Sequence, residues 1–477
     1  MQTLAISGHM RLPFVWRKVS VVFGGFGFVA LAAANIIGPD DWYMLGLLCV
    51  SVLAYAIIII VLGFRDGMRR ILTDPFLILI ISFSLYYLVG PLLLIFGSED
   101  EISYVVSWYP VTAINAVLVT SINLIGLAIM LYISSYFNGL GIVRTVQPVI
   151  SFFSKYSVER VFWLFAMIGF IAFAIVQTSD ELVSGTIRIL AQLLLMAILL
   201  GTICQGRGSS RLHSLAIMIT IFTSVMGLLS FSKSEAMLPI VVLVLGLYLR
   251  SVSIKLIVII LVIVFLGLGL IVKPITEARI MLLLSADNSL SNRYYILQEA
   301  FQKAYDSTST NKTKAGLWTR LCYVPPQVAS VDLFDKGQGG HDMELMFWVF
   351  IPRAIYPDKP IITRTGNELN AQVTGSESSS TGVGLFVGGY YSLGWVGIIL
   401  VSVISGLILS IFATVSRLII SSGLMIGLPV GLFGNFMAFR IDGYFVGDYL
   451  GPFAMIMMTF LTVLFILHTG IPKTSTK

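Results

Sequence analysis

Charged residues are scarce in this sequence. Asp, Glu, Lys and Arg make up only 11% of its 477 residues, while hydrophobic residues make up 57%. Soluble domains carry about 25% charged residues, so the low content excludes an ordinary soluble protein. The net charge of +6 does not indicate a nucleic-acid-binding surface, because the excess bases lie in short connections between apolar runs, where membrane orientation accounts for them.

Cysteine and histidine are also scarce, at three and four residues. Cys49 and Cys204 lie within apolar runs, so Cys322 has no disulfide partner in its long polar segment. No CxxC pair is present and the histidines are far apart. This pattern excludes a zinc site built from Cys and His, and we expect neither a metal nor another cofactor.

Long apolar runs dominate the chain instead. A helix needs about 20 mostly apolar residues to cross a bilayer core about 30 Å thick. Twelve runs qualify: 19–37, 43–63, 75–97, 110–134, 161–178, 186–204, 213–231, 236–250, 254–272, 384–415, 422–440 and 450–469. The first run follows basic residues, as in a signal peptide, but it exceeds the roughly 7–15 residues of a signal core. The sequence therefore predicts an all-α polytopic membrane protein with about twelve transmembrane helices.

Alternate connections between these runs are basic. They hold Arg11, Arg17, Lys18, Arg65, Arg69, Arg70, Arg144, Lys155, Arg160, Arg207, Arg211, Arg250, Lys255, Arg417, Lys473 and Lys477. Asp66, Asp74 and Glu159 are the only acids among these sixteen bases. The positive-inside rule then predicts that both termini and these connections face the cytoplasm.

One segment is too long to be a connection. It follows the ninth span, lies outside the cytoplasm in this topology, and holds eleven bases and eleven acids between Lys273 and Gly382. The chain thus divides into spans 1–9 (1–272), a large extracytoplasmic loop (273–383) and spans 10–12 (384–477). Loops of this length are usually functional or disordered, and its many aromatic residues argue against disorder.

Two helices are expected within the large loop. The pattern over 288–306 predicts an amphipathic helix, and 342–350 predicts a second helix lying against the membrane surface. The first would place these apolar residues near one face: Leu290, Tyr294, Leu297, Phe301 and Tyr305. Two groups of glycines predict close helix packing: Gly24, Gly25 and Gly27, and Gly382, Gly384, Gly388 and Gly389.

The cations of the large loop are candidate functional residues, because the positive-inside rule does not explain them. They include Arg279, Arg293, Arg320, Arg353, Lys359 and Arg364. Arginine presents a planar fork suited to phosphate oxygens. Placed in advance, such cations can stabilise the charge on a departing pyrophosphate without a metal. Others of the set are expected to pair with loop acids or lipid headgroups.

His341 lies alone in a polar stretch of the loop. A histidine near its ordinary pKa suits a general base that activates a sugar hydroxyl, and the alternative is an exposed loop residue. Asp342 and Glu344 beside it could hold a divalent cation through oxygen ligands, although surface solvation is the expectation.

Two further cations lie in short external turns. Lys233 could reach the cavity of the large loop or merely pair with Glu235. Arg440 could pair with Asp442 or line the same cavity.

The late loop resembles a known family. The run IPRAIYPDKP (351–360), the spacing Arg364-x10-Gly375 and the run GVGLFVGGYYSLGWVGIIL (382–400) resemble the O-antigen polymerase family and, more broadly, the oligosaccharide-repeat-unit polymerases of bacterial surface polysaccharides. The resemblance covers roughly 343–406.

This resemblance implies a GT-C-type glycosyltransferase in the bacterial inner membrane, acting without a metal. It would join repeat units carried on undecaprenyl pyrophosphate at the periplasmic face, with membrane lipids around it and a chain-length regulator as a possible partner. Arg364 matches the arginine of the family's Arg-x10-Gly motif, and Arg353 and Lys359 suit the same role less specifically. Relatives often carry an arginine where this chain has Lys233.

Three other functions remain open. An O-antigen ligase of the same architecture would use His341 as its base. A flippase or transporter of lipid-linked sugars would need charges within its spans, where this chain has few. A GT-C enzyme that uses a polyprenyl-monophosphate sugar would place acids in the first external loop, where Asp40 and Asp41 lie.

Overall fold

The protein is helical wherever its structure is described. The computed structural model describes 13–65, 74–137, 157–178, 190–204, 209–250, 289–305, 317–351, 355–356, 358–377, 380–421, 428–454 and 456–458, with single residues between 262 and 285. Within these ranges no strand occurs, and seven helices are long and apolar enough to cross a membrane. The expectation of a helical membrane protein is therefore confirmed.

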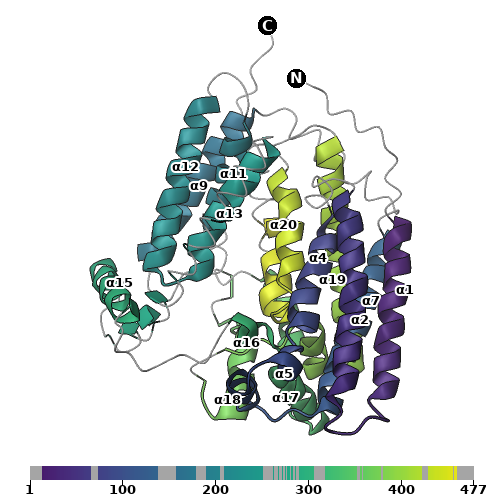
Figure 1. Ribbon diagram of the computed structural model, residues 1–477. Coiled ribbons are helices and arrows are strands. Elements are labelled where there is room, and N and C mark those ends of the chain that lie inside the picture. The colour runs from purple at the N-terminus through teal and green to yellow at the C-terminus, as the bar shows by residue number, and fades with distance from the viewer. Residues whose placement is uncertain are drawn as a thin grey trace. The chain divides into compact units, whose positions relative to one another are not determined.

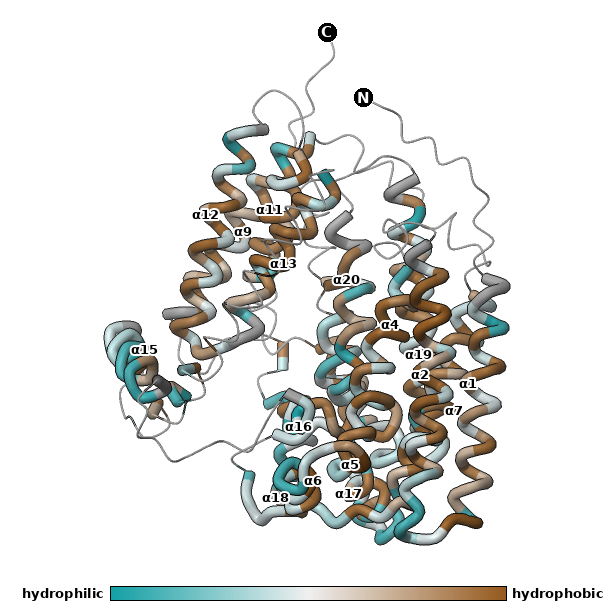
Figure 2. Tube along the Cα trace, in the orientation of Figure 1, coloured by the Kyte–Doolittle hydropathy of each residue, from teal (hydrophilic) through white to brown (hydrophobic). Residues whose placement is uncertain are grey.

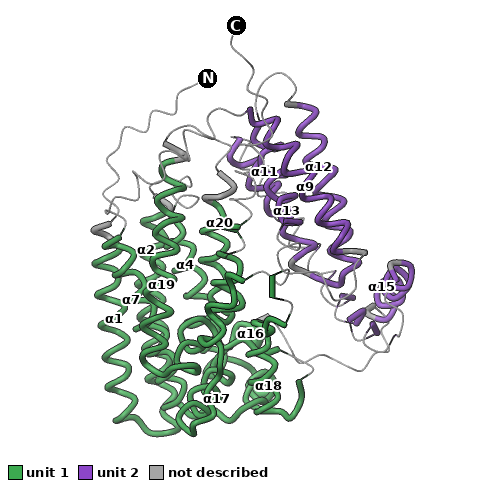
Figure 3. Tube along the Cα trace, turned by 180° about the vertical axis from the view of Figure 1, so that it is seen from behind, with its two compact units in different colours: residues 1–151, 313–477 green, residues 152–312 purple. Residues whose placement is uncertain are grey.

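The chain forms two compact units, drawn in different colours in Figure 3. Unit 1 comprises residues 1–151 and 313–477, and unit 2 comprises 152–312. The predicted large loop is thus divided, because its first part belongs to unit 2 and its remainder to unit 1.

Unit 1 is built on long apolar helices that pack along their lengths (Figure 1). Its elements are α1 (Pro13–Ala33), α2 (Trp42–Arg65), α4 (Pro75–Ser84), η1 (Leu85–Val89), α5 (Leu93–Phe96), α6 (Glu99–Val106), α7 (Ala113–Phe137), α16 (Leu317–Leu321), α17 (Val324–Asp335), η2 (Asp342–Phe350), α18 (Thr365–Thr374), α19 (Leu385–Ser421), α20 (Leu428–Phe439) and η4 (Phe445–Leu450). Helix α7 packs against α1 and α19, and α20 packs against α4 and α19.

Glycines bring α1 and α7 close together. A Cβ built on Gly27 would lie 2.8 Å from Cγ1 of Ile125, and one on Gly24 would lie 3.3 Å from Cβ of Ala128. The packing prediction is confirmed for these two glycines. It is wrong for Gly25, whose Cβ would meet nothing within 4 Å, because that position lies off the contact face.

The run predicted as one long span at 384–415 is not a straight helix. Leu393 and Gly394 leave the helical conformation, and Gly394 has φ +59°. In a straight helix residues eight apart are separated by about 12 Å, whereas a Cβ on Gly389 would lie 2.8 Å from the carbonyl oxygen of Gly397. The segment 385–392 therefore folds back on the long helix that follows, and two glycines permit the contact.

Unit 2 consists of α9 (Val158–Thr178), α11 (Leu193–Ile203), α12 (Ser209–Leu229), α13 (Lys233–Leu249) and α15 (Leu290–Tyr305). Helix α11 packs against α9, α12 and α13. A tight turn joins α12 to α13, and in it Phe231 is fully buried with φ +52°. The predicted spans near 254–272 and 450–469 lie largely outside the described residues.

The amphipathic helix expected over 288–306 is confirmed as α15, but its buried face is not the expected one. Ile296, Leu297 and Ala300 pack against the core around Phe231, whereas Tyr294 is 58% exposed. Of the predicted apolar face, Leu297 is the member packed against this core. The small Ala300 lets the helix approach closely there, which a hydropathy pattern that favours large side chains does not register.

Candidate functional site

Short polar helices gather at one end of unit 1. Helices α5, α6, α16, α17 and α18 lie together at one end of unit 1, where α17 packs against α7 and α19 (Figure 1), and Figure 2 shows hydrophilic residues among them. Trp318 of α16 donates from Nε1 to the carbonyl oxygen of Val89 at 2.9 Å, which fixes α16 to η1. We call this group of five helices the cap; of the predicted cations, Arg320 lies in its helix α16 and Arg364 immediately precedes α18.

The turn after α20 joins the cap to the long helices. The carbonyl oxygen of Ile441 accepts hydrogen bonds from Leu385 N, at 2.8 Å, and from Tyr87 Oη. The carbonyl oxygen of Asp442 accepts one from Gly384 N at 3.1 Å. A Cβ on Gly384 would strike the Tyr87 hydroxyl. This packing fits the glycine prediction and leaves no room for a side chain there.

Asp442 does not pair with Arg440. Its Oδ2 accepts a hydrogen bond from Tyr323 Oη at 3.2 Å. Burial raises the pKa of Asp442, against the lowering effect of this bond and of Arg440. Burial and the nearby Asp442 also raise the pKa of Tyr323, so this hydroxyl remains a donor.

Asp342 is 1% exposed, so the expectation that it is a solvated surface acid is wrong. Its Oδ2 accepts a hydrogen bond from the backbone N–H of Val446 at 3.1 Å, and its Oδ1 lies 3.5 Å from Oγ1 of Thr365. Burial raises the pKa of Asp342 to about 7. The residue begins η2 and fastens it to η4 and α18, while Phe347 and Phe350 of the same helix remain 74% and 51% exposed.

Arg364 lies immediately before α18. Its Nε is 3.7 Å from Glu368 Oε1 and its Nη2 is 3.5 Å from Glu377 Oε2, while the side chain stays 53% exposed. Helix α18 ends at Gly375, whose φ of +76° suits glycine. The Arg-x10-Gly spacing therefore corresponds to one short helix with its arginine at the N-terminus, where the helix dipole adds to the positive field.

Arg440 lies in the turn that follows α20 and contacts an acid of η4. Its Nη2 lies 3.7 Å from Asp448 Oδ1, and its side chain is 43% exposed. Its guanidinium carbon also lies 5.5 Å from the ring centroid of Phe436. Asp448 is fixed in turn, because its Oδ2 accepts a hydrogen bond from Tyr444 N at 3.1 Å.

The chain before α18, which ends at Arg364, packs against η4, which carries Asp448, the acid that contacts Arg440. A Cβ on Gly447 would lie 3.3 Å from the carbonyl oxygen of Ile362 and 3.5 Å from Cγ2 of Thr363. Arg364 follows Thr363, and the partner of Arg440 follows Gly447. We call this place the Thr363–Gly447 contact.

A buried tyrosine and three acids, of which Asp342 is buried, lie near this contact. Tyr444 is 5% exposed, and its hydroxyl has no hydrogen-bond partner among the described residues. Burial raises the pKa of Tyr444, and Asp342, Asp448 and Glu368 add to the rise because their negative charges are close. Each carboxylate near the two arginines contacts its guanidinium through one oxygen and one nitrogen, at 3.5–3.7 Å. None of these described pairs is bidentate.

His341 lies at the edge of this group of charges. Its Nδ1 is 3.0 Å from Oε1 of Glu344, and its side chain is 69% exposed. The hydrogen bond to Glu344 raises the pKa of His341, and Glu368 contributes. Glu344 therefore orients the imidazole and leaves it accessible, while Asp342 is buried, so these two acids do not form the cation site considered from the sequence.

The remaining predicted residues of unit 1 are more dispersed. Lys359 Nζ donates to the carbonyl oxygen of Ile351 at 2.9 Å, which closes the proline-bounded run. Arg320 is exposed in α16 and forms no ion pair with any residue that the structure describes. Arg353 lies outside the described residues.

Three predicted cations belong to unit 2. Arg279 donates from Nε to the carbonyl oxygen of Phe231 at 2.7 Å, so it supports the turn that precedes α13. Lys233 begins α13 beside this turn, and its side chain is not described. Arg293 lies on α15 with its Nε buried and without a hydrogen-bond partner among the described residues. The predicted cations are thus divided between two units, and in unit 1 Arg364 and Asp448, the partner of Arg440, lie on the two segments of the Thr363–Gly447 contact.

Several functional candidates were missed from the sequence. Asp448, Glu368 and Tyr444 form the charged and polar surroundings of the two arginines, and no motif singled them out. For Asp448 and Tyr444 the signal was the density of acids and tyrosines after α20, in FRIDGYFVGDY (439–449), and for Glu368 it was its position four residues after Arg364. Within the described ranges, no group of three or more His, Cys, Asp or Glu side chains is placed to hold a metal ion.

Comparisons with known proteins add no relative to this picture. No family model, no curated protein and no solved structure matches the chain significantly.

Proposed function

We propose that the chain is a glycosyltransferase of the bacterial inner membrane that joins oligosaccharide repeat units carried on undecaprenyl pyrophosphate. In this proposal it crosses the membrane about twelve times, both termini lie in the cytoplasm, and the large loop 273–383 between spans nine and ten is periplasmic. The resemblance of 343–406 to O-antigen polymerases supplies the reaction class. The observation that supports it most is the Thr363–Gly447 contact, which packs the segment that carries Arg364 against η4, where the acid that contacts Arg440 lies.

The two arginines suit a pyrophosphate leaving group. Each guanidinium has five N–H donors, and the carboxylates contact them at 3.5–3.7 Å, beyond the roughly 2.7–2.9 Å of a strong charge-assisted hydrogen bond. Both side chains are about half exposed, so a pyrophosphate can bind them without leaving a charge buried and unpaired. The acids around them keep the forks in position before the substrate arrives.

The reaction transfers a glycosyl group. The bond between the anomeric carbon of the donor chain and its pyrophosphate oxygen breaks, and the acceptor hydroxyl oxygen bonds to that carbon. The hydroxyl proton passes to His341, which Glu344 orients, and lipid pyrophosphate leaves with the electron pair of the broken bond. In this proposal Arg364, Arg440 and Arg353 of unit 1 stabilise the pyrophosphate, and Arg320 and Lys359 contribute to substrate binding.

One observation favours a second function, an O-antigen ligase of the same architecture. The hydrogen bond between His341 and Glu344 gives an accessible, oriented imidazole, which a ligase would use to activate a hydroxyl of lipid A-core.

Deletion of the gene in its host, followed by complementation, tests these functions. The complementing proteins are wild type, Arg364→Ala, Arg364→Lys and Lys336→Ala at matched membrane levels. Loss of an arginine that stabilises a charged transition state costs about 2–4 kcal/mol, or roughly 10²–10³ in rate. Arg364→Ala is expected to lose the polysaccharide ladder on a gel, and Arg364→Lys to restore it in part. Lys336→Ala is the matched control, because Lys336 pairs with Asp332 at 3.7 Å on α17, away from both arginines in sequence.

Each outcome of the deletion has its own interpretation. Single repeat units on lipid A-core support the polymerase, and long chains retained on the lipid carrier support the ligase. Lipid-linked units trapped on the cytoplasmic side support a flippase. An unchanged ladder in the deletion strain contradicts the proposal.

A further inference from the structure

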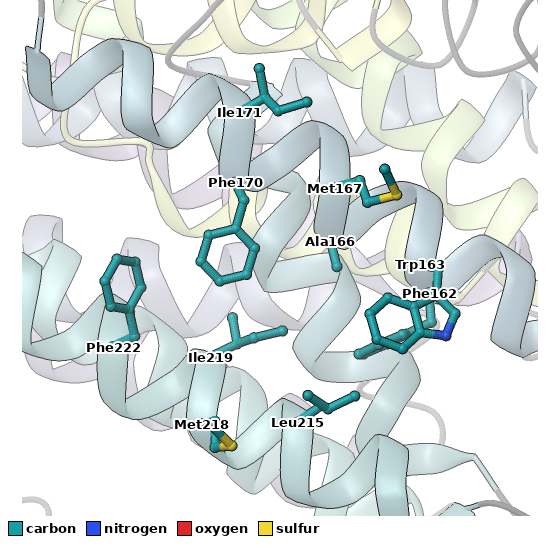
Figure 4. A pocket seen from close by; sticks show the side chains of 10 residues that line it. All are labelled: Phe162, Trp163, Ala166, Met167, Phe170, Ile171, Leu215, Met218, Ile219 and Phe222. Atoms are coloured by element: carbon teal, nitrogen blue, oxygen red, sulfur yellow. The ribbon is translucent and has the colours of Figure 1, made fainter.

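An open apolar groove lies between α9 and α12 in unit 2. Its volume is about 490 Å³, within the roughly 300–1,000 Å³ of ligand pockets. Figure 4 shows the side chains that line it: Phe162, Trp163, Ala166, Met167, Phe170, Ile171, Leu215, Met218, Ile219 and Phe222. Met167 is 62% exposed and Met218 64%, so nothing in the described part of unit 2 covers the groove. An apolar chain of a ligand would be sheltered there on two sides.

Two arginines lie one turn beyond one end of this groove, on the faces that line it. On α9, Trp163 and Met167 follow Arg160 by three and seven residues. On α12, Leu215 and Met218 follow Arg211 by four and seven residues. Residues at these spacings share one face of a helix, so each arginine extends the apolar stripe of its own helix.

The two arginines belong to the same end. A Cβ on Gly201 would lie 2.8 Å from both Phe162 Cε2 and the carbonyl oxygen of Leu212, so the starts of α9 and α12 are neighbours. Arg160 and Arg211 are both exposed, and neither makes an ion pair with a described residue. Trp163, three residues after Arg160, is 45% exposed, as aromatic residues at a membrane interface commonly are.

We propose that this groove binds an anionic phospholipid, with one acyl chain along α9 and α12 and the phosphate between Arg160 and Arg211. The arrangement matches the lipid in order: an anionic headgroup beside two cations, an interfacial tryptophan, then an apolar chain. A helix from a second copy of the protein is the alternative occupant of the groove, and the experiment below distinguishes it from a lipid.

The predicted topology indicates which leaflet would supply the lipid. The positive-inside rule places Arg160 and Arg211 on the cytoplasmic side, where the leaflet presents anionic headgroups that attract Lys and Arg. This inference does not depend on the proposed glycosyl transfer, which concerns Arg364 and Arg440 of unit 1.

Native mass spectrometry of the purified full-length protein tests the proposal. Phosphatidylglycerol and phosphatidylcholine with the same acyl chains are titrated onto wild type, Arg160→Gln, Arg211→Gln and the double variant. A Lys or Arg near an anionic headgroup changes affinity about fivefold, so the double variant is expected to bind phosphatidylglycerol about 25-fold more weakly. Its binding of phosphatidylcholine should be unchanged.

Two further variants separate this site from general effects. Arg17→Gln removes an exposed arginine on α1, outside the groove, and is expected to leave both lipids bound as in wild type. Ala166→Trp fills the groove and is expected to weaken both lipids. Equal phosphatidylglycerol binding by the double variant and wild type would overturn the proposal, as would an equal loss in Arg17→Gln. A dimer dissociated by Ala166→Trp with lipid binding unchanged would instead assign the groove to a second copy.

Discussion

Asp342 and Val446 lie 104 residues apart in the sequence, yet the buried carboxylate of one accepts the backbone N–H of the other at 3.1 Å. This contact joins η2 to η4, the helix that also takes part in the Thr363–Gly447 contact. Because Asp342 is 1% exposed, its charged form has little solvation, and its protonation is linked to the stability of the fold.

The stability of the protein is expected to fall as the pH rises from about 4 to about 7. Burial raises the pKa of Asp342 to about 7 in the folded protein, against about 3.9 in an unfolded chain. Below both values each state is protonated. Between them the unfolded chain ionises first, so the free energy of unfolding decreases with pH, by at most about 4 kcal/mol.

Thermal unfolding in detergent across this pH range measures the effect. Asp342→Asn keeps an acceptor for the Val446 N–H and should flatten the dependence in part, since burial also raises the pKa of Asp442. Asp40→Asn, at an exposed acid, should leave the slope unchanged. A wild-type slope retained in Asp342→Asn would contradict the assignment.

Gln327 links α7, α17 and the segment before α19, and its loss should be costly. Its Oε1 accepts from Asn123 Nδ2 at 3.1 Å, and its Nε2 donates to the carbonyl oxygen of Val383 at 2.9 Å. Both side chains are almost fully buried. Gln327→Leu leaves two buried polar groups unpaired, at about 1–3 kcal/mol each, so the free energy of unfolding should fall by about 2–5 kcal/mol.

A double-mutant cycle with Asn123→Leu checks the cause. If the hydrogen bond is responsible, Asn123→Leu should cost less in the Gln327→Leu background than in wild type. Equal costs in both backgrounds would show that the two side chains are not coupled.

The fold-back of α19 depends on Gly397. A Cβ there would fall on the carbonyl oxygen of Gly389, so Gly397→Ala is expected to lower the free energy of unfolding by about 1–3 kcal/mol through overpacking. Gly25→Ala is the matched control, because its Cβ meets nothing within 4 Å and alanine in a helix interior stabilises by about 0.5–1 kcal/mol. Opposite shifts of the unfolding temperature are expected, and shifts of the same sign would contradict this account of the hairpin.

Glu344 is expected to keep the imidazole of His341 protonated to higher pH. The hydrogen bond to Glu344 raises the pKa of His341, so Glu344→Gln should lower it. The chain has four histidines, and the resonance missing in His341→Gln identifies the one to follow in an NMR titration. Glu299→Gln removes an exposed acid of α15 that pairs with Lys303 and should not move this titration. An unchanged pKa of His341 in Glu344→Gln would show that Glu344 does not raise it.

If His341 is the general base, the same variant reports on the proposed reaction. The rate should fall at low pH as the imidazole becomes protonated. Glu344→Gln should move this acidic limb of the pH–rate profile to lower pH. A limb that stays in place while the NMR titration moves would remove His341 from the proposed mechanism.

The sequence by itself determined that this is a helical membrane protein. In lipid the backbone N–H and C=O groups of an apolar run can form hydrogen bonds only with one another. Runs of membrane-spanning length must therefore form helices. Local patterns also determined α15 over nearly the predicted range and the helix at 342–350, because residue spacing and capping act within a few turns. The helix between Arg364 and Gly375 was not predicted, although the glycine that supplies its C-terminal turn is a local signal.

Only the tertiary structure decided what surrounds these elements. Asp342, expected in solvent, is buried because η4 and α18 close over it, and Arg440 contacts Asp448 rather than the nearer Asp442. Such partners depend on which segments cross, and neither hydropathy nor spacing encodes contacts between residues 104 positions apart. The turn at Gly394 could not be predicted for the same reason. An unbroken apolar run predicts one span, but the close contact of Gly389 with Gly397 allows the chain to fold back there.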